Sequence, residues 1–463
     1  MTSTRCLLAA LLALLPTLTI HAGEPRRPNI VFILADDLGW TDLGCQGSKY
    51  YETPNIDRLA REGMRFTSAY TCGPNCQPTR AALMSGQYGP RTGVYTVGGT
   101  DRFDTSKRPL VPVENVTKLP IDRTTIAQSL RDSGYATALF GKWHLGEMPK
   151  FHPGNRGFDE ALVTMGKHFD FVVKPPVSYP KGTYLADWLT DQAERFIDKN
   201  REKPFFLYLA HFGVHSPFDA KKELVERFKS KAKVGGHRDP TYAAMIQSVD
   251  ESVGRVMKKL ADLKLDENTI VIFSSDNGGV GGYREAGINT NEGITSNFPL
   301  RGGKGMLYEG GVRVPWIMKW TGRIRPGSTS DEPIISVDLF PTFCGVAKAK
   351  TPAKQVLDGL DIAPVYLGDG SAKLDRKAIY WHFPGYLGSG KNEWRTTPAG
   401  AIRAGDWKLQ ESFEEGKLEL HNLKDDIGQT KNLAAEQPAR RDELHRMLRD
   451  WRESVGAPMP AKR

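Results

Sequence analysis

The 463-residue sequence has few cysteines and no apolar run long enough to cross a bilayer. Its five cysteines and ten histidines show no spacing typical of a zinc site, which argues against a zinc centre. It also lacks internal repeats, low-complexity tracts and the basic-aromatic motifs of nucleic-acid-binding proteins. We therefore expect a globular protein with no membrane span and no nucleic-acid partner. Its length favours a large domain plus a smaller one.

The N-terminus has the pattern of an export signal. Arg5 precedes an apolar run over residues 7–15, and Ala22 ends a stretch of small residues that suits cleavage. A membrane anchor is the alternative, but the run is too short to span a bilayer. We predict a signal peptide over residues 1–22 and a secreted or periplasmic location.

Removing the signal also removes Cys6 and leaves four cysteines, Cys45, Cys72, Cys76 and Cys344. If Cys76 is chemically modified, the other three can form at most one disulfide, so disulfides are not expected to hold the fold. The formal net charge is +9, or +8 once Arg5 is subtracted. A basic exported protein favours acidic partners, and sulfated polymers fit as well as nucleic acids do.

Apolar strand-like runs alternate with helical patterns through most of the chain. The expected strands are residues 29–35, 205–210, 269–274 and 312–316. The expected helices are residues 55–60, 125–131 and the segment in which Met245, Val249, Val253, Val256 and Leu260 recur. This alternation predicts an α/β fold with a large, mostly parallel or mixed sheet sandwiched by helices.

The pattern changes after a polar, glycine-containing stretch at residues 361–375, which we interpret as a linker. Short strands with hairpin-like spacing are expected at residues 378–383, 400–404, 407–410 and 417–421, and an amphipathic helix at 438–454. We therefore predict an N-terminal catalytic domain over residues 28–365. A smaller antiparallel sheet packed with a helix is expected over residues 375–463.

Polar pairs follow two of the predicted strands. Asp36 and Asp37 come directly after the first strand, and Asp276 and Asn277 follow the strand at 269–274. Active sites of such sheets usually lie at the carboxyl ends of the strands. These oxygen ligands suit a hard cation, Ca²⁺ or Mg²⁺, and we favour Ca²⁺ because it tolerates irregular geometry.

Two motifs carry a family resemblance. Residues 76–86 read Cys-Gln-Pro-Thr-Arg-Ala-Ala-Leu-Met-Ser-Gly, and residues 134–144 contain Gly-Tyr-Ala-Thr followed by Gly-Lys-Trp-His. Both resemble the signatures of the type I, arylsulfatase-like sulfatases of the alkaline-phosphatase superfamily. The resemblance implies that a maturation enzyme oxidises Cys76 to formylglycine, whose hydrate is the nucleophile. Lys142 and His144, two apart, would face one side of an extended segment.

Single residues match the family by context. The resemblance implies catalytic roles for Cys76, Arg80, Lys142, His144, His215 and Lys304. It implies one metal ion held by Asp36, Asp37, Cys76, Asp276 and Asn277. Arg80 would hold the nucleophile, and Lys142, His215 and Lys304 would bind the sulfuryl oxygens. His144 would act as the base that releases sulfate.

The expected reaction is hydrolysis of a sulfate monoester, through formylglycine and bound Ca²⁺, on a sulfated carbohydrate cut at a terminal sugar or on an aryl sulfate. The basic segment 96–120 contributes Arg102, Lys107, Arg108 and Lys118, and with His382 and Trp394 it offers candidates for the pocket rim. Core packing or simple exposure explains these rim residues equally well. Two alternatives stay open: a phosphomonoester or phosphonate hydrolase of the same superfamily, and an inactive polyanion-binding homologue.

Overall fold

The computed structural model describes residues 27–463 except 148, 285, 289–292 and 391–392. The predicted signal peptide at 1–22 lies outside the described residues. Within the described part, no helix is both long enough and apolar enough to cross a membrane.

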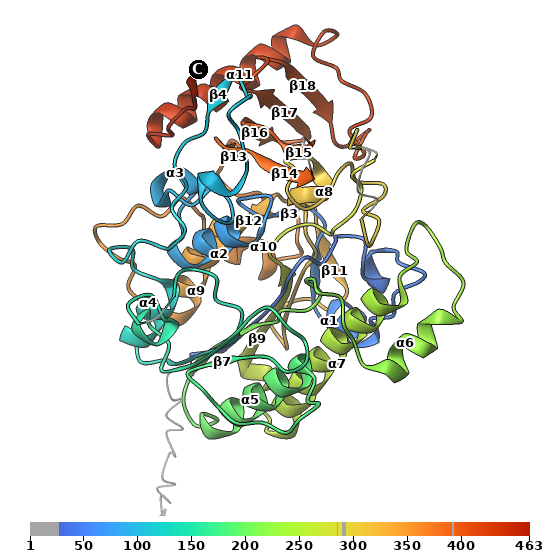
Figure 1. The fold of residues 1–463 in the computed structure, drawn as a ribbon. Coiled ribbons are helices and arrows are strands. Elements are labelled where there is room, and N and C mark those ends of the chain that lie inside the picture. The colour runs from blue at the N-terminus through green and yellow to red at the C-terminus, as the bar shows by residue number, and fades with distance from the viewer. Residues whose placement is uncertain (1–26, 148, 285, 289–292, 391–392) are drawn as a thin grey trace, which may run out of the picture.

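A nine-stranded sheet forms the centre of the molecule (Figure 1). Its strands, in spatial order, are β11 (Ser328–Ser330), β2 (Met64–Phe66), β10 (Trp316–Trp320), β9 (Thr269–Ser275), β1 (Asn29–Ala35), β8 (Phe205–Ala210), β5 (Ala136–Gly141), β6 (Glu160–Thr164) and β7 (Val173–Lys174). The five strands from β9 to β6 run parallel, while β10 and β7 are antiparallel to their neighbours. All seven residues of β1 are buried, as expected for a central parallel strand covered on both faces.

Helices cover both faces of the sheet (Figure 1). Successive side chains of β1 point to opposite faces, so Val31 and Ile33 join one core and Phe32 joins the other. The first core includes α1 (Pro54–Glu62), α5 (Leu185–Lys199), α6 (Lys222–Lys229) and α7 (Pro240–Asp262). The second includes α2 (Cys76–Ser85), α4 (Ile126–Asp132) and α9 (Leu339–Ala347). The predicted α/β sandwich is confirmed.

A four-stranded antiparallel sheet follows near the C-terminus. Its order is β13 (Ile379–Phe383), β16 (Ala399–Ala404), β17 (Trp407–Ser412) and β18 (Leu418–Asn422). Helix α11 (Pro438–Ser454) packs on it through Leu444 and Leu448. Three two-stranded pairs complete the strands: β12 (Ile334–Ile335) with β3 (Ala69–Tyr70), β14 (Leu387–Gly390) with β15 (Glu393–Thr396), and β19 (Ala461–Lys462) with β4 (Leu110–Val111). Among the described residues, the remaining α-helices are short: α3 (Gly89–Thr92), α8 (Glu309–Val312) and α10 (Ala363–Tyr366).

Two predicted elements are wrong. The strand expected at residues 312–316 lies at Trp316–Trp320 instead, and Val312 ends the short helix α8. Pro315 precedes the observed strand and has no N–H to give to the ladder, so pairing starts after it. The stretch at 361–375 is not a simple linker, because Val365 and Tyr366 of α10 are buried in the second core.

The four cysteines in the described part of the chain are all free. Burial raises the pKa of the Cys45 thiol to about 12, and Cys72 and Cys344 likewise have raised pKa values. These three thiols therefore stay protonated and pack as small apolar groups. This agrees with the expectation that disulfides do not hold the fold.

Candidate functional site

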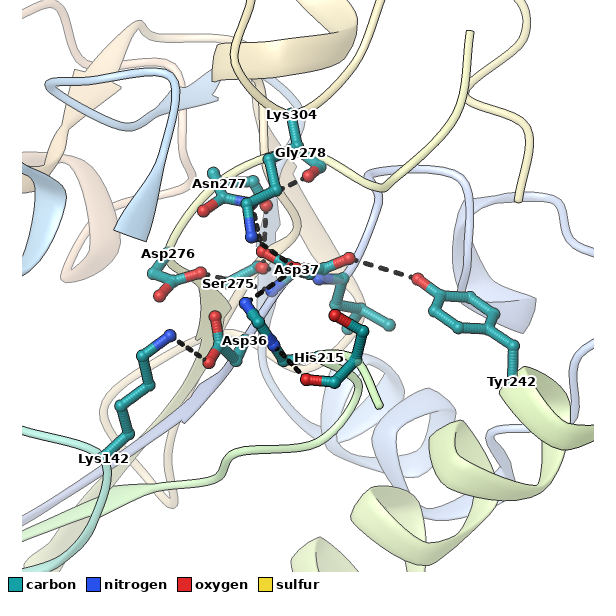
Figure 2. A network of polar contacts seen from close by, with 12 residues as sticks. Asp36, Asp37, Lys142, His215, Tyr242, Ser275, Asp276, Asn277, Gly278 and Lys304 are labelled. Atoms are coloured by element: carbon teal, nitrogen blue, oxygen red, sulfur yellow. Dashed lines mark hydrogen bonds and ion pairs between the residues drawn. The ribbon is translucent and has the colours of Figure 1, made fainter. Parts of the chain in front are cut away.

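The predicted site residues meet at the carboxyl ends of the parallel strands. Asp36 and Asp37 follow β1, Lys142 follows β5, and Asp276 follows the neighbouring strand β9. Figure 2 shows Lys142, His215 and Lys304 pointing toward these carboxylates from different parts of the chain. The meeting of these side chains follows from the sheet order, because β9, β1, β8 and β5 are direct neighbours.

Cys76 and Arg80 lie on one face of helix α2. Cys76 is the first residue of the helix, and Arg80 follows one turn later, which is the spacing that places side chains side by side. Helix α2 ends at Gly86, whose φ of 67° allows its N–H to cap Ala82 O. Both side chains are deeply buried, with 2% and 1% of Cys76 and Arg80 exposed. The spacing of the first motif is therefore a helical spacing.

Lys142 occupies its place because Gly141 precedes it. A Cβ at Gly141 would lie 1.9 Å from the carbonyl oxygen of Ala210, and the φ of Gly141 is 113°, so only glycine fits between β5 and β8. The chain then turns Lys142 inward, where its Nζ lies 2.5 Å from Asp36 Oδ2. Arg80 donates to the carbonyl oxygen of Lys142 at 2.7 Å.

The prediction that Lys142 and His144 share an extended segment is wrong for His144. Strand β5 ends at Gly141, and His144 has a φ of 62°, in the left-handed region. Gln77, the neighbour of Cys76, donates to His144 O at 3.0 Å and so holds this turn against α2. Burial, together with the nearby charges of Lys142 and Arg80, holds the pKa of His144 well below its usual value. The ring is therefore held in its neutral form.

Asp37 lies at the centre of a second group of contacts. Its Oδ2 is 2.6 Å from Lys304 Nζ and 3.7 Å from His215 Nε2, and its Oδ1 accepts from Asn277 Nδ2 at 2.9 Å. Burial alone would raise the pKa of Asp37, but Lys304 and His215 lower it further than burial raises it. These carboxylates have the opposite effect on His215. Burial lowers the pKa of His215, but Asp37 and Asp36 raise it to about 9. His215 is thus a cation near neutral pH.

Asp276 pairs with Arg80. Arg80 Nε and Nη2 lie 2.8 and 2.7 Å from Asp276 Oδ2. Burial and the neighbouring Asp36 raise the pKa of Asp276 to about 6, despite the guanidinium. Burial is the larger cause and the neighbouring carboxylate the second, and a cation placed among these carboxylates would oppose both.

Several of these residues could hold a metal ion. One ligand atom each from Asp36, Asp37, Cys76 and His215 lie within 4.8 Å of one another. Asp36 Oδ1 and Asn277 Oδ1 are buried without a hydrogen-bond partner, as expected for oxygens whose partner is an ion. These oxygens suit a hard cation. The residues present therefore fit the predicted metal.

The site also carries an excess of positive charge. Arg80, Lys142, Lys304 and the protonated His215 face three carboxylates. Burial raises the pKa of the Cys76 thiol, but Lys142 and Lys304 lower it to about 7. An anion in contact with these groups would be stabilised by preorganised cations whose side chains are mostly buried.

Two positioning residues were not predicted. Tyr242 on α7 donates to Asp37 O at 3.1 Å, and Ser275 Oγ accepts from Leu38 N at 3.0 Å (Figure 2). They fix the backbone around Asp37, whose φ is 65°. No sequence signal marks Tyr242, because its contact joins segments about two hundred residues apart.

The rim candidates separate into two places. His382 is buried in β13 and its Nε2 contacts Pro458 O at 2.8 Å, which favours a packing role. Trp394 packs against Phe103, and the Arg108 guanidinium lies 5.7 Å from the Trp394 ring centroid. The basic segment 96–120 therefore docks on the C-terminal part of the chain.

This fold and site define an α/β enzyme built to bind an anionic ester. A sequence model described as Sulfatase matches residues 28–349, and one described as N-sulphoglucosamine sulphohydrolase, C-terminal, matches residues 303–454. The chain belongs to the sulfatase family and is a sulfuric ester hydrolase.

Known relatives agree with this assignment. A sulfatase of Formosa agariphila is 35% identical, with 94% of this chain and 90% of that protein covered. The N-acetylgalactosamine-6-sulfatase of Canis lupus familiaris is 34% identical, with 85% and 74% covered. The crystal structure of Ps i-CgsB in complex with k-i-k-neocarrahexaose has a TM-score of 0.75 and 31% identity, with 92% and 93% covered.

Proposed function

We propose that this protein hydrolyses a sulfate monoester of a sulfated glycan, acting on a terminal sugar, with Cys76 matured to formylglycine and one bound Ca²⁺. The observation that carries the proposal is the position of Cys76 at the start of α2. Its sulfur there lies within 4.8 Å of a ligand oxygen of both Asp36 and Asp37, and the charges of Lys142 and Lys304 lower the pKa of its thiol.

The protein groups divide the work by position. Lys142, His215 and Lys304 bind and orient the sulfuryl oxygens, and one of them protonates the leaving oxygen. Arg80 holds a hydroxyl of the matured residue 76. A formylglycine hydrate supplies one hydroxyl that accepts the sulfuryl group and a second whose deprotonation releases sulfate. The neutral ring of His144 supports its role as the base for that release.

Asp36, Asp37, Asp276, Asn277 and residue 76 would hold the cation. A bound Ca²⁺ supplies positive charge that lowers the pKa of the nucleophilic hydroxyl and polarises a sulfate oxygen. Mg²⁺ is the second choice, because it demands a more regular octahedron.

A glycan substrate and export complete the proposal. The relative named N-acetylgalactosamine-6-sulfatase and the structure in complex with k-i-k-neocarrahexaose support a sulfated sugar as substrate. The signal-like N-terminus and the basic net charge support a secreted or periplasmic protein that meets acidic polymers. Oxidation of Cys76 requires a separate formylglycine-generating enzyme in the producing cell. We also propose that the chain divides into a catalytic domain over residues 28–365 and a smaller C-terminal domain over residues 375–463.

Paired substrates test the reaction. We expect turnover of 4-nitrophenyl sulfate to exceed that of 4-nitrophenyl phosphate in kcat/KM. Preference for the phosphate would identify the phosphomonoesterase alternative. If neither ester is turned over although residue 76 is matured, the polyanion-binding alternative is favoured. Intact mass of the peptide containing residue 76 reports the maturation, since replacing the thiol by an aldehyde removes about 18 Da.

Removal of the metal should lower thermal stability. An ion that binds only the folded chain stabilises it by about 2.7 kcal/mol at a concentration a hundred times its Kd. We therefore expect EGTA to lower Tm and added Ca²⁺ to restore it, with Mg²⁺ less effective. Asp36→Asn should abolish the response, whereas Asp375→Asn, at an exposed position outside the site, should keep it. A stronger response to Zn²⁺ than to Ca²⁺ would contradict the assignment.

A further inference from the structure

A cavity of about 470 Å³ adjoins the site. Two of its lining residues belong to the catalytic surroundings: His144, and Gln77, which directly follows Cys76 on α2. The volume falls within the range of cavities that bury small organic ligands. We call this space the leaving-group cavity, because it borders His144 and the residue that follows Cys76.

The wall of the leaving-group cavity is mainly aliphatic. Val97, Val163, Met165 and Val172 line it. Met165 is 51% exposed and Val172 is 66% exposed, so large apolar surface faces solvent on the side where the cavity lies. Neighbouring apolar side chains left open in this way mark a surface that a ligand or partner covers.

The polar lining is asymmetric in charge. Lys118 and Lys174 are exposed and carry positive charge, whereas Glu147 is the single carboxylate among the lining residues. His152 also lines the cavity, with its Nε2 3.3 Å from Lys174 O. The Lys118 ammonium lies 5.3 Å from the Phe151 ring centroid and makes no ion pair among the described residues. The lining therefore offers an apolar surface together with net positive charge.

We propose that the leaving-group cavity holds the sugar that bears the sulfate ester, with the C–H face of the ring on the aliphatic wall and an anionic substituent of the saccharide against Lys118 or Lys174. The substituent is a carboxylate or a second sulfate. A neutral aryl or alkyl leaving group would use the wall and leave the lysines without a role. The inference rests on the proposed function, because it places the sulfuryl group next to residue 76.

Binding to a protein that cannot turn over substrate tests the cavity directly. In the full chain with Cys76→Ala, calorimetry would give the Kd of three related probes. The first is a monosulfated disaccharide that contains a uronic acid, the second is its carboxyl methyl ester, and the third is that ester with a second sulfate. We expect the double variant Lys118→Gln, Lys174→Gln to raise the Kd of the first or the third probe about fivefold to tenfold. The Kd of the second probe, which lacks the extra charge, should hardly change. Lys350→Gln, at an exposed position outside the cavity, is the matched control.

The wall is tested in the same way. Met165→Ser with Val172→Ser should weaken all three disaccharides several-fold, because each presents the same ring face. Equal effects of the lysine variants on charged and neutral probes, or no effect at all, would overturn the proposal. So would wall variants that affect 4-nitrophenyl sulfate binding alone, since this identifies a neutral leaving group as the occupant. Turnover of sulfate esters by the matured wild-type enzyme is measured separately, so a failure of the proposed function leaves the binding result valid.

Discussion

Replacing Cys76 by Ala is expected to abolish turnover of sulfate esters, lowering kcat about 10⁴-fold to 10⁶-fold, as removal of a covalent nucleophile does in other hydrolases. Alanine cannot be oxidised to an aldehyde, so no hydroxyl remains to accept the sulfuryl group. The measurement is kcat on 4-nitrophenyl sulfate, with protein whose maturation has been verified by mass.

Cys45→Ala is the matched control. Cys45 is a free thiol outside the site, and its raised pKa keeps it protonated. This variant should retain wild-type kcat. Turnover by Cys76→Ala above about one part in a hundred of wild type would show that residue 76 is not the nucleophile. The Tm of Cys76→Ala distinguishes the two causes of inactivity: an unchanged Tm indicates loss of chemistry, and a much lower Tm indicates misfolding.

Glu309→Gln should cost about 3–5 kcal/mol of folding stability, the usual result of breaking a buried ion pair. Glu309 and Lys408 are both 0% exposed, and Glu309 Oε1 lies 2.8 Å from Lys408 Nζ. Arg313 lies 3.3 Å from Oε2, and Tyr70 donates to Oε2 at 2.7 Å. Glutamine keeps the Tyr70 hydrogen bond but leaves the cations without a counter-charge. Urea unfolding measures the loss.

Two further variants make this prediction specific. Adding Lys408→Met to Glu309→Gln should recover part of the stability, because a buried charge is removed together with its partner. Glu415→Gln, at an exposed glutamate, should change stability by less than about 0.5 kcal/mol. A loss below about 1 kcal/mol for Glu309→Gln would show that Lys408 and Arg313 do not need this carboxylate.

The same pair gives a pH dependence. Burial raises the pKa of Glu309, but Lys408 and Arg313 lower it from 4.5 to about 2. A lowered folded-state pKa contributes stability that is complete above the unfolded value and is lost in acid. The wild-type protein should therefore lose this contribution as pH falls from about 4.5 toward 2, and Glu309→Gln should lose less over that interval.

Elements with a strong local pattern were predictable from the sequence. β1 after Asn29 and the whole of β8 are uninterrupted apolar runs. Both strands were predicted to the residue, as was α11, which begins at Pro438. The strand expected at 312–316 was misplaced because the prediction followed the apolar pattern and disregarded Pro315. Helix α10 was missed because four residues carry too little periodicity to show a helix.

The site was predictable only in part. The acidic pairs stood out because strand ends meet at one edge of a parallel sheet. Which cation faces which carboxylate was not predictable, since the Arg80–Asp276 and Lys304–Asp37 contacts join segments that are distant in the sequence. The left-handed turn at His144 was also missed, because it depends on the contact of Gln77 with the His144 carbonyl.

The burial of Cys76 bears on whether its oxidation can follow folding. Only 2% of this residue is exposed, and its sulfur lies close to ligand atoms of Asp36, Asp37 and His215. If Cys76 is oxidised to formylglycine as proposed, a maturation enzyme could not reach the segment around it once the chain has folded. Oxidation would then have to act on the nascent or unfolded chain, and the active fraction of a preparation would depend on the relative rates of synthesis, oxidation and folding. A molecule that folds with Cys76 unmodified would stay inactive.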